Sequence, residues 1–431
     1  MRSSDKIYIR MNNGGYDSAF YCLYQAGADC RKRYAALLER FGERFGSREP
    51  SVLISAPGRV EIGGNHTDHQ RGRVIAASVD RDIICAASPR KDDIYRLFSD
   101  GFEPIASSIA DLSPRETEKG NSAALVRGIA AWFERNGYKT GGFDACMSSD
   151  IPCGSGFSSS AAFEVAVGTI FNVLYNGGCI PPEEIAIAGQ FAENMYFGKP
   201  CGLMDQTVCS VGGLLLIDFL NTSKPDIRRL DFDLRPHGLN LCIVNTGGDH
   251  SRLTAEYEEI FTEMRAAARH FGKECLREVS ADEFIGGLPA VRRIAGDRAV
   301  LRAMHFFREN ERVYKQAVAL EYNDIGAFLG MVNESGRSSE FLLQNIYSPS
   351  SPGIQSLSLA LALSEEILKG SGAWRVHGGG FAGTIQAYVP DSLMPEYAAV
   401  MDRVFGNGAC FPVFIRKAGV FVLAADYSHS T

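Results

Sequence analysis

Glycine is abundant and clustered in this chain, and the clustering constrains the fold more than any other feature. The sequence contains 45 glycines among 431 residues, which is about 10% against a usual value near 7%. The excess is concentrated in polar segments at 56–72, 153–162, 198–213 and 377–384. Glycine permits tight turns and a close approach of the backbone to a ligand. The pattern therefore predicts several tight loops instead of general flexibility.

The length and composition fit a folded protein of two domains. At roughly 100–200 residues per domain, 431 residues predict two or three domains or one large α/β unit. Hydrophobic residues make up 45% and charged residues 22%, close to globular averages, which excludes global disorder. Residues 220–238 carry many charges and two prolines. This stretch is the predicted junction between a first domain, 1–225, and a second, 226–431.

The charge balance excludes several classes of partner. Acidic residues outnumber basic ones by 51 to 44, giving a net charge of −7 and a pI near 5.7. No stripe of lysine and arginine compensates, which argues against nucleic-acid binding. The apolar runs are too short to span a membrane, and the N-terminus lacks an apolar signal core. The 11 cysteines contain no CxxC pair. We expect a soluble, cytoplasmic protein with buried thiols.

Hydrophobic periodicity predicts the main helices and strands. The first 20 residues are weakly patterned and predict an irregular arm, whereas the apolar spacing at 30–45 predicts an amphipathic helix. Strands are expected at 52–56 and from residue 74, with a polar loop between them. Further predicted elements are helices at 123–135, from 158, at 182–197 and at 251–270, and strands at 141–149, 214–219 and 241–246.

The segment Gly154–Ala162 combines small residues with three successive serines before a strongly apolar helix. Free amides at a helix N-terminus and the positive end of the helix dipole form an anion site. An ordinary cluster of capping serines is the alternative. No GxxxxGK[ST] motif is present, the third glycine of GxGxxG is Ser159, and the motifs of protein kinases are absent.

The segment Ala56–Gly72 is dense in hydrogen-bonding side chains. Donors and acceptors packed this closely suit a ligand with many hydroxyl groups. The alternatives are a solvated surface loop and a metal site made from His66, Asp68 and His69, which would be a poor ligand set. The side chains concerned are Arg59, Glu61, Asn65, His66, Thr67, Asp68 and His69.

Two acidic residues stand out between 190 and 213. Glu193 falls on a predicted helix, and Asp205 falls in the glycine-flanked loop after it. Two separated carboxylates can divide the tasks of holding a metal and accepting a proton. A surface residue or a helix cap is the alternative for each.

Taken together, these segments resemble the galactokinase branch of the GHMP small-molecule kinases. The motifs APGRV…GNHTDH, IPCGSGFSSSAA, AENMYFGKPCGLMDQ and VHGGGFAGT occur in the family's order from about Tyr34 to the end of the chain. The resemblance implies an α+β fold with an N-terminal domain like ribosomal protein S5 and a ferredoxin-like C-terminal domain. It further implies transfer of the γ-phosphoryl group of ATP, with Mg²⁺, to the anomeric hydroxyl of a hexose.

The resemblance also implies a role for each matched position. Asp205 would be the catalytic aspartate, with Arg59 as its basic partner, and Glu193 and Ser159 would hold Mg²⁺. The ATP phosphates would lie against Gly154, Ser155, Gly156, Ser158 and Ser160. Sugar-contacting positions are Asn65, His66, Asp68 and Tyr257, and Gly378–Gly380 would allow a close chain approach. We expect galactose as the substrate and a monomeric enzyme.

One departure from the family pattern bears on the sugar. Where the family reads GEHTDY, this chain has Asn65 and His69 in GNHTDH. The missing glutamate normally helps to recognise the C6 hydroxyl, so we expect weaker reliance on that group. A neutral Asn65, with Arg71 and Arg73 nearby, leaves a kinase for a C6-altered sugar such as galacturonate as an alternative. A non-catalytic sugar-sensing relative is a second alternative, although the Asp205, Arg59 and serine motifs are intact.

Overall fold

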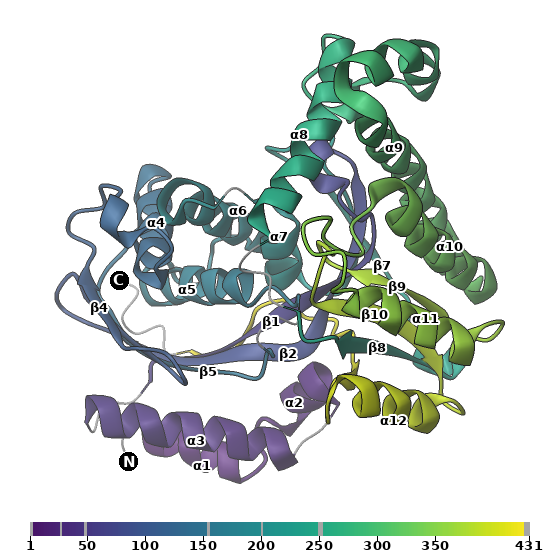
Figure 1. Ribbon diagram of the computed structural model, residues 1–431. Helices are drawn as coiled ribbons and strands as arrows, with labels where there is room; N and C mark the ends of the chain where they lie inside the picture. Colours follow the sequence, from purple (N-terminus) through teal and green to yellow (C-terminus); the bar gives the residue numbers. More distant parts are fainter. Residues whose placement is uncertain are drawn as a thin grey trace.

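The computed structural model describes residues 3–25, 28–46, 50–152, 156–199, 201–248 and 253–425. Within these ranges the chain forms an eight-stranded sheet and a four-stranded sheet, with helices packed on both (Figure 1). The predicted α+β class is confirmed.

The larger sheet is built around two long antiparallel strands, β1 (Val52–Gly63) and β2 (Arg73–Pro89). Its main order is β12-β1-β2-β5-β3-β4, while β6 pairs with the first part of β2 and β7 pairs with β6. The bounds of the other strands are β3 (Ile94–Ser99), β4 (Ile105–Ser108), β5 (Phe143–Ser149), β6 (Leu214–Asp218), β7 (Asp226–Leu230) and β12 (Phe421–Ala425).

Helices cover both faces of the larger sheet (Figure 1). α3 (Ala28–Phe45) lies under one face, where its residues Tyr34, Leu37 and Phe41 are fully buried in a cluster shared with sheet residues. On the other face α5 (Ser159–Asn176) is buried on nearly all sides. The same two layers contain α1 (Ser3–Asn12), α2 (Asp17–Tyr24), α4 (Ser122–Arg135), α6 (Pro182–Ala192) and α7 (Met204–Val211).

The structure differs from the predicted local structure in two places. The N-terminal segment is helical, because Met11, Tyr16 and Phe20 bury an apolar face in the cluster under the sheet. The polar segment after residue 56 is not all loop, because β1 continues to Gly63. Alternate strand residues share a face, so Arg59 and Glu61 point the same way, while Val60 and Ile62 enter the core.

The smaller sheet is fully antiparallel in the order β11-β8-β10-β9. Three helices pack on it (Figure 1). The elements are β8 (Leu239–Asn245), β9 (Ala373–His377), β10 (Thr384–Pro390), β11 (Cys410–Val413), α10 (Ile325–Ser338), α11 (Ser356–Leu368) and α12 (Met394–Phe405).

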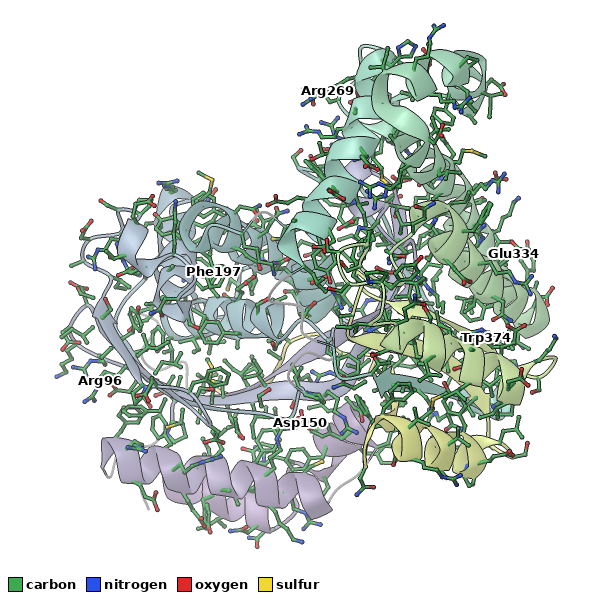
Figure 2. The ribbon with its side chains drawn as sticks, in the orientation of Figure 1. Arg96, Asp150, Phe197, Arg269, Glu334 and Trp374 are labelled. Carbon is green, nitrogen blue, oxygen red and sulfur yellow. The ribbon has the colours of Figure 1, made fainter. Side chains whose placement is uncertain are left out.

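A helical arm projects from the molecule. It consists of α8 (Thr254–His270) and α9 (Ala281–Glu321), which pack on each other (Figure 1). Arg269, near the end of α8, lies toward the far end of this arm (Figure 2). Short helical segments are η1 (Asp68–Gln70), η2 (Glu116–Glu118), η3 (Glu193–Phe197), η4 (Arg235–His237), η6 (Leu276–Glu278) and η7 (Ser339–Leu343), of which η3 and η7 are π-helical.

The two sheets do not divide the chain at a single point. β7 begins at Asp226 and belongs to the larger sheet, and the chain returns to that sheet at β12. The boundary at residues 225 and 226 stays a prediction. In the part of the chain that is described, no helix combines the length and apolarity needed to cross a membrane.

Candidate active site

Arg59 and Asp205 form a bidentate ion pair between β1 and α7. Arg59 Nε donates to Asp205 Oδ1 at 2.7 Å, and Arg59 Nη2 donates to Oδ2 at 2.8 Å. Asp205 lies in the first turn of α7, not in the predicted loop, and the positive end of the helix dipole favours a carboxylate there. The Arg59 side chain is 9% exposed and the Asp205 side chain 31% exposed. The arginine is therefore enclosed, while the carboxylate stays open to a ligand.

The surroundings of Asp205 keep it ionised. Burial raises the pKa of Asp205, but the charge of Arg59 and hydrogen bonds from Arg59 and Ser158 outweigh burial, and the pKa lies below its ordinary value. Burial lowers the pKa of Arg59, yet Asp205 raises it by more, so the guanidinium stays charged. An ionised, partly open carboxylate can accept a proton from a bound hydroxyl group.

Two residues of the glycine–serine segment complete this centre. Ser158 adopts a left-handed backbone (φ 55°) immediately before α5, and its hydroxyl donates to Asp205 Oδ2. Gly156 accepts a hydrogen bond from Arg59 Nη1 through its carbonyl. A Cβ on Gly156 would lie 3.2 Å from His377 Nδ1, and φ is +72°. Glycine thus fits a position where the backbone turns and approaches a neighbouring side chain closely.

The start of α5 offers free backbone donors next to Asp205. Ala162 N–H makes the first helical hydrogen bond, to Ser158, so the amides of Ser159, Ser160 and Ala161 have no acceptor in the helix. Ser159 is exposed and Ser160 is half-buried. Of the predicted phosphate-binding residues, Gly154 and Ser155 lie outside the described residues. Ser158 is turned toward Asp205, so its hydroxyl is already used.

Three predicted sugar-binding residues converge on the loop between β9 and β10. Asn65 Nδ2 donates to the carbonyl of Gly378 at 2.7 Å, and His66 Nε2 donates to that of Gly379 at 2.9 Å. Tyr257 donates its hydroxyl to the next carbonyl in this loop, Gly380, at 2.9 Å. Burial lowers the pKa of His66, which keeps the ring neutral. Residues from two distant segments therefore fix one glycine loop.

Asn65 differs from the expected sugar contact. The residue is fully buried, and its amide donates to Glu61 as well as to Gly378. Its carbonyl oxygen accepts from Asn345 Nδ2 at 2.9 Å and from Ser339 Oγ at 3.2 Å. An asparagine amide has two donors and two acceptor lone pairs, and all four are used here. No donor or acceptor of this side chain remains for the C6 group of a sugar.

Asp68, a predicted sugar-binding residue, is half-buried. Its carboxylate lies against Gly202, where a Cβ would come within 2.4 Å of Asp68 Oδ2. Burial, with a smaller contribution from the charge of Asp205, raises the pKa of Asp68 to about 6.

Arg71 pairs with Glu274 and Glu278, at 3.1 and 2.6 Å. The side chain of Arg73 pairs with Asp218 at 2.7 Å. Neither of these arginines carries an unpaired charge for a sugar carboxylate.

Glu193 lies beside a second buried acid that the sequence reasoning missed. Gln206 Nε2 donates to Glu193 Oε2 at 3.0 Å and to Glu164 Oε2 at 2.9 Å. Lys199 Nζ donates to the other oxygen of Glu193 at 3.2 Å. Burial, followed by the charge of Glu193, raises the pKa of Glu164 well above its ordinary value. Glu164 Oε1 and Gln206 Oε1 are buried and accept no hydrogen bond from a described residue.

This set of oxygens fits Mg²⁺, which prefers carboxylate and amide oxygens. Glu164 Oε1 and Gln206 Oε1, which accept no hydrogen bond from the described residues, would be free to supply ligands to such an ion or to hold its water. Across the described residues, no group of three or more His, Cys, Asp or Glu side chains is arranged to hold a metal by itself. The alternative metal site at His66, Asp68 and His69 is therefore not formed.

The missed residues left a faint signal in the sequence. Gln206 directly follows Asp205, and Glu164 is a lone acid in an apolar helix. Arg375 and His377 lie two residues apart on β9, so their side chains share one face of the smaller sheet, and both contact Glu61. His377 Nε2 accepts from the Glu61 amide at 3.3 Å, so its Nδ1 proton donates to Thr384 Oγ1 at 3.0 Å. Arg375 and His377 reach the site only because the smaller sheet packs against the larger one.

Comparison with known proteins first defines the class. Residues 124–213, which include Ser158, Glu193 and Asp205, match the GHMP kinases N terminal domain. The structure of Methanococcus jannaschii mevalonate kinase aligns with a TM-score of 0.60 at 15% identity, covering 86% of this chain and 99% of that one. The chain has the fold and the sequence signature of a GHMP small-molecule kinase.

A narrower set of findings identifies the branch. Residues 39–89 match the galactokinase galactose-binding signature. A galactokinase of Actinobacillus pleuropneumoniae is 32% identical over 368 residues, covering 84% of this chain and 91% of that protein. The structure of Lactococcus lactis galactokinase complexed with galactose shares the fold with a TM-score of 0.79 at 23% identity, covering 90% of this chain and 99% of that one. The chain belongs to the galactokinase family.

Proposed function

We propose that this protein transfers the γ-phosphoryl group of ATP to the anomeric hydroxyl of galactose and forms galactose 1-phosphate. The observation that carries the proposal is the Arg59–Asp205 pair beside the free amides of α5, in a member of the galactokinase family. The pair joins β1 to α7, and its carboxylate is partly open to solvent. A non-catalytic sugar sensor would have no need for it.

Asp205 is the proposed proton acceptor. The anomeric O–H loses its proton to Asp205 as the oxygen bonds to the γ-phosphorus, and ADP leaves with the electrons of the broken P–O bond. Arg59 holds the carboxylate in place with two hydrogen bonds and offsets negative charge near the transferred group. Ser158 fixes the second carboxylate oxygen. The geometry thus favours positioning and electrostatic stabilisation, the main sources of catalysis in phosphoryl transfer.

The ATP phosphates are proposed to bind at the N-terminus of α5. The amides of Ser159, Ser160 and Ala161 have no acceptor within the helix, and the helix dipole adds attraction for an anion. Gly156 would extend this cradle, and Ser160 would add its hydroxyl. The same role stays a prediction for Gly154 and Ser155, which lie outside the described residues.

Mg²⁺ is proposed to bind at Glu193 and Ser159. Glu164 and Gln206 would line this site with their unpartnered oxygens. When bound, the ion would offset the negative charge of the terminal phosphates.

Sugar binding is assigned to His66, Asp68 and Tyr257. Asp68 supplies a charged acceptor for sugar hydroxyls, and the other two hold the Gly378–Gly380 loop beside it. Galactose is favoured over galacturonate because Arg71 and Arg73 are already paired with acids. We further infer a cytoplasmic monomer, as expected from the sequence. Analytical ultracentrifugation would test the oligomeric state.

The decisive experiment measures transfer of radiolabelled γ-phosphate from ATP to a panel of acceptors. The panel contains galactose, 6-deoxygalactose, galacturonate, glucose and mevalonate, and the Asp205→Asn variant is the control for contaminating kinases. Efficient transfer to galactose, lost in the variant, is the expected result. Transfer to galacturonate or mevalonate in preference to galactose would contradict the assignment. Binding of galactose without any transfer would indicate a sensor.

A further inference from the structure

A buried ion pair joins the two sheets next to the proposed sugar site. Arg375 Nη2, on β9, donates to Glu61 Oε1, on β1, at 2.7 Å. Arg375 Nη1 also donates to the carbonyl of Ile62 at 3.0 Å. The side chains of Arg375 and Glu61 are 0% and 6% exposed. Removing one partner of a buried ion pair destabilises a protein much more than the intact pair stabilises it. The pair therefore constrains how the two sheets pack against each other.

Asn65 is bonded to this ion pair. Its Nδ2 lies 3.1 Å from Glu61 Oε1, the same oxygen that accepts from Arg375. The other bonds of Asn65 run to the smaller-sheet side, to Gly378 and Asn345. Its backbone carbonyl accepts from His305 Nε2 at 2.9 Å. Residue 65 therefore ties the sugar-binding segment to elements from the second half of the chain.

We propose that Glu61, Asn65 and Arg375 form a positioning network that sets the sugar-binding segment against the Gly378–Gly380 loop. Residue 65 acts on the substrate through this network and does not touch it. The residue is an amide in this chain because Glu61 already supplies the buried carboxylate. The part of the proposal that concerns sugar affinity rests on the proposed function, whereas the coupling between the residues does not.

The charge on residue 65 is decisive in this arrangement. A carboxylate at position 65 would lie about 3 Å from that of Glu61, in a place closed to water, where Arg375 is the arginine bonded to Glu61. Burial already raises the pKa of Glu61, and Arg375 and Arg59 offset burial only in part. A second carboxylate would also face the carbonyl of Gly378 in place of a donor.

The test is a double-mutant cycle with Asn65→Asp, Glu61→Gln and the double variant. Asn65→Asp should lower kcat/KM for galactose by about tenfold or more, through KM for galactose and not KM for ATP. It should also lower the Tm. The double variant should recover much of both losses, because the added carboxylate then faces an amide donor and Arg375 keeps one carboxylate nearby. Asn407→Asp, which adds the same charge at an exposed turn, should change neither quantity.

A second comparison separates positioning from direct contact. If residue 65 acts through the network, Asn65→Ala should reduce kcat/KM by the same factor for galactose and for 6-deoxygalactose, which lacks the C6 hydroxyl. A loss confined to galactose would overturn the proposal, as would additive effects on Tm in the cycle. If the wild type phosphorylated no galactose, the proposed function would fail, and the coupling in Tm would still decide whether the network exists.

Discussion

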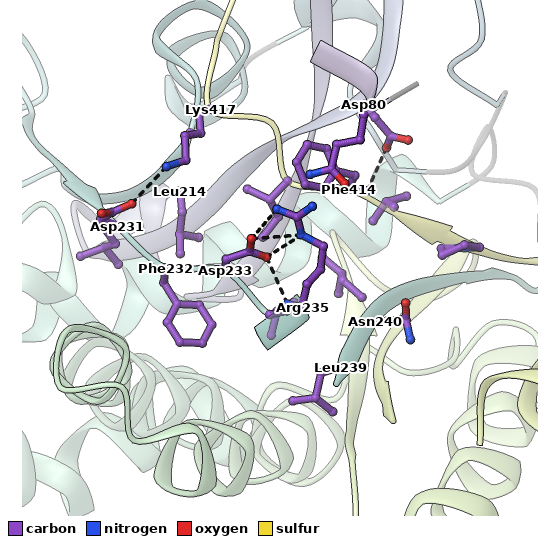
Figure 3. Close-up of a pocket in the computed structure, with 18 of the residues that line it drawn as sticks. Asp80, Leu214, Asp231, Phe232, Asp233, Arg235, Leu239, Asn240, Phe414 and Lys417 are labelled. Atoms are coloured by element: carbon purple, nitrogen blue, oxygen red, sulfur yellow. Dashed lines mark hydrogen bonds and ion pairs between the residues drawn. The ribbon is translucent and has the colours of Figure 1, made fainter. Parts of the chain in front are cut away.

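The two sheets meet at two places rich in charge, and these places differ in how the charges are paired. At the proposed active site Arg59 and Asp205 are 146 residues apart in sequence and largely enclosed. The other place is a cavity of about 570 Å³ lined by strands β6, β7, β8 and β11 (Figure 3). There Arg235 pairs with Asp233, two residues before it, and Lys417 pairs with Asp231 at 3.4 Å.

The difference shows that the size of a cavity does not locate the chemistry. The side chains of Lys417 and Asp231 are 88% and 97% exposed, and such pairs contribute about 0–1 kcal/mol. The hydrogen bonds from Arg235 lower the pKa of Asp233, and burial opposes this shift without reversing it. The Arg59–Asp205 pair, by contrast, forms only when β1 and α7 are in place. Convergence of buried charges from distant elements is the better indicator of a site.

The largest expected effect is that of Asp205→Asn. The amide keeps the shape of the carboxylate but cannot take a proton, so kcat should fall by about 10²–10⁴. Steady-state kinetics with galactose should show a much smaller change in KM. Asp233→Asn, the same substitution at the exposed pair, should leave kcat within about twofold. Similar effects of both substitutions would remove the distinction between the two places.

Arg59→Lys should follow, with a loss in kcat of about 10- to 100-fold, because lysine cannot form both hydrogen bonds to Asp205. The pH profile gives a sharper readout. Arg59 lowers the pKa of Asp205 against the effect of burial, so weakening Arg59 lets that pKa rise. The acid limb of the kcat profile should therefore move to higher pH in the variant. An unchanged limb would mean that Asp205 is not the group that titrates.

Gln206→Met tests the carboxylates beside this pair. Gln206 donates to both Glu164 and Glu193, and loss of such an outer partner typically weakens metal binding by about 10- to 100-fold. The measurement is binding of Mn²⁺, followed by electron paramagnetic resonance with a non-hydrolysable ATP analogue. Gln355→Met removes an exposed amide and should have no effect. Equal Mn²⁺ affinity in both variants would exclude a metal at Glu193.

Much of the fold could be predicted from the sequence, because local patterns determine it. The period of the apolar residues predicted α3, α4, α5 and α6 with their approximate ends, and the glycine segments predicted the loops around the site. The N-terminal helices were not predicted from the sequence, because their charged residues mask the apolar face. The course of β1 escaped because Arg59 and Glu61 are polar residues in a buried strand.

The site was predictable only where a motif carried it. Arg59 and Asp205, expected as partners from the matched motifs, form an ion pair in the structure, whereas the bond from Ser158 to Asp205 was not expected. The four hydrogen bonds of the Asn65 side chain could not be predicted from the sequence, because three of its partners lie more than 270 positions away along the chain. Glu164 and Arg375 could not be assigned from the sequence either. A lone buried charge is interpretable only once the group facing it is known.

Asp68 should make substrate capture depend on pH. Burial raises its pKa to about 6, so it is ionised above that pH and gains a proton as the pH falls through it. The protonated form loses its charged acceptor, and kcat/KM for galactose should fall by up to about tenfold per pH unit below pH 6. Asp68→Asn should give a lower kcat/KM without this limb. A limb that survives the substitution would belong to another group.

The smallest effect is expected at the cavity, from Arg235→Lys, which matches Arg59→Lys in chemistry. The guanidinium of Arg235 forms three hydrogen bonds with the carboxylate of Asp233 and lies 5.0 Å from the centre of the Phe414 ring. Because both partners are exposed and only two residues apart in sequence, the free energy of unfolding should change by no more than about 1 kcal/mol. The kcat/KM for galactose should stay within about twofold, as measured beside the wild type in denaturant titrations and steady-state assays. A loss of kcat/KM comparable with that of Arg59→Lys would show that the cavity is coupled to catalysis. The cavity and the proposed active site would then differ in position but not in function.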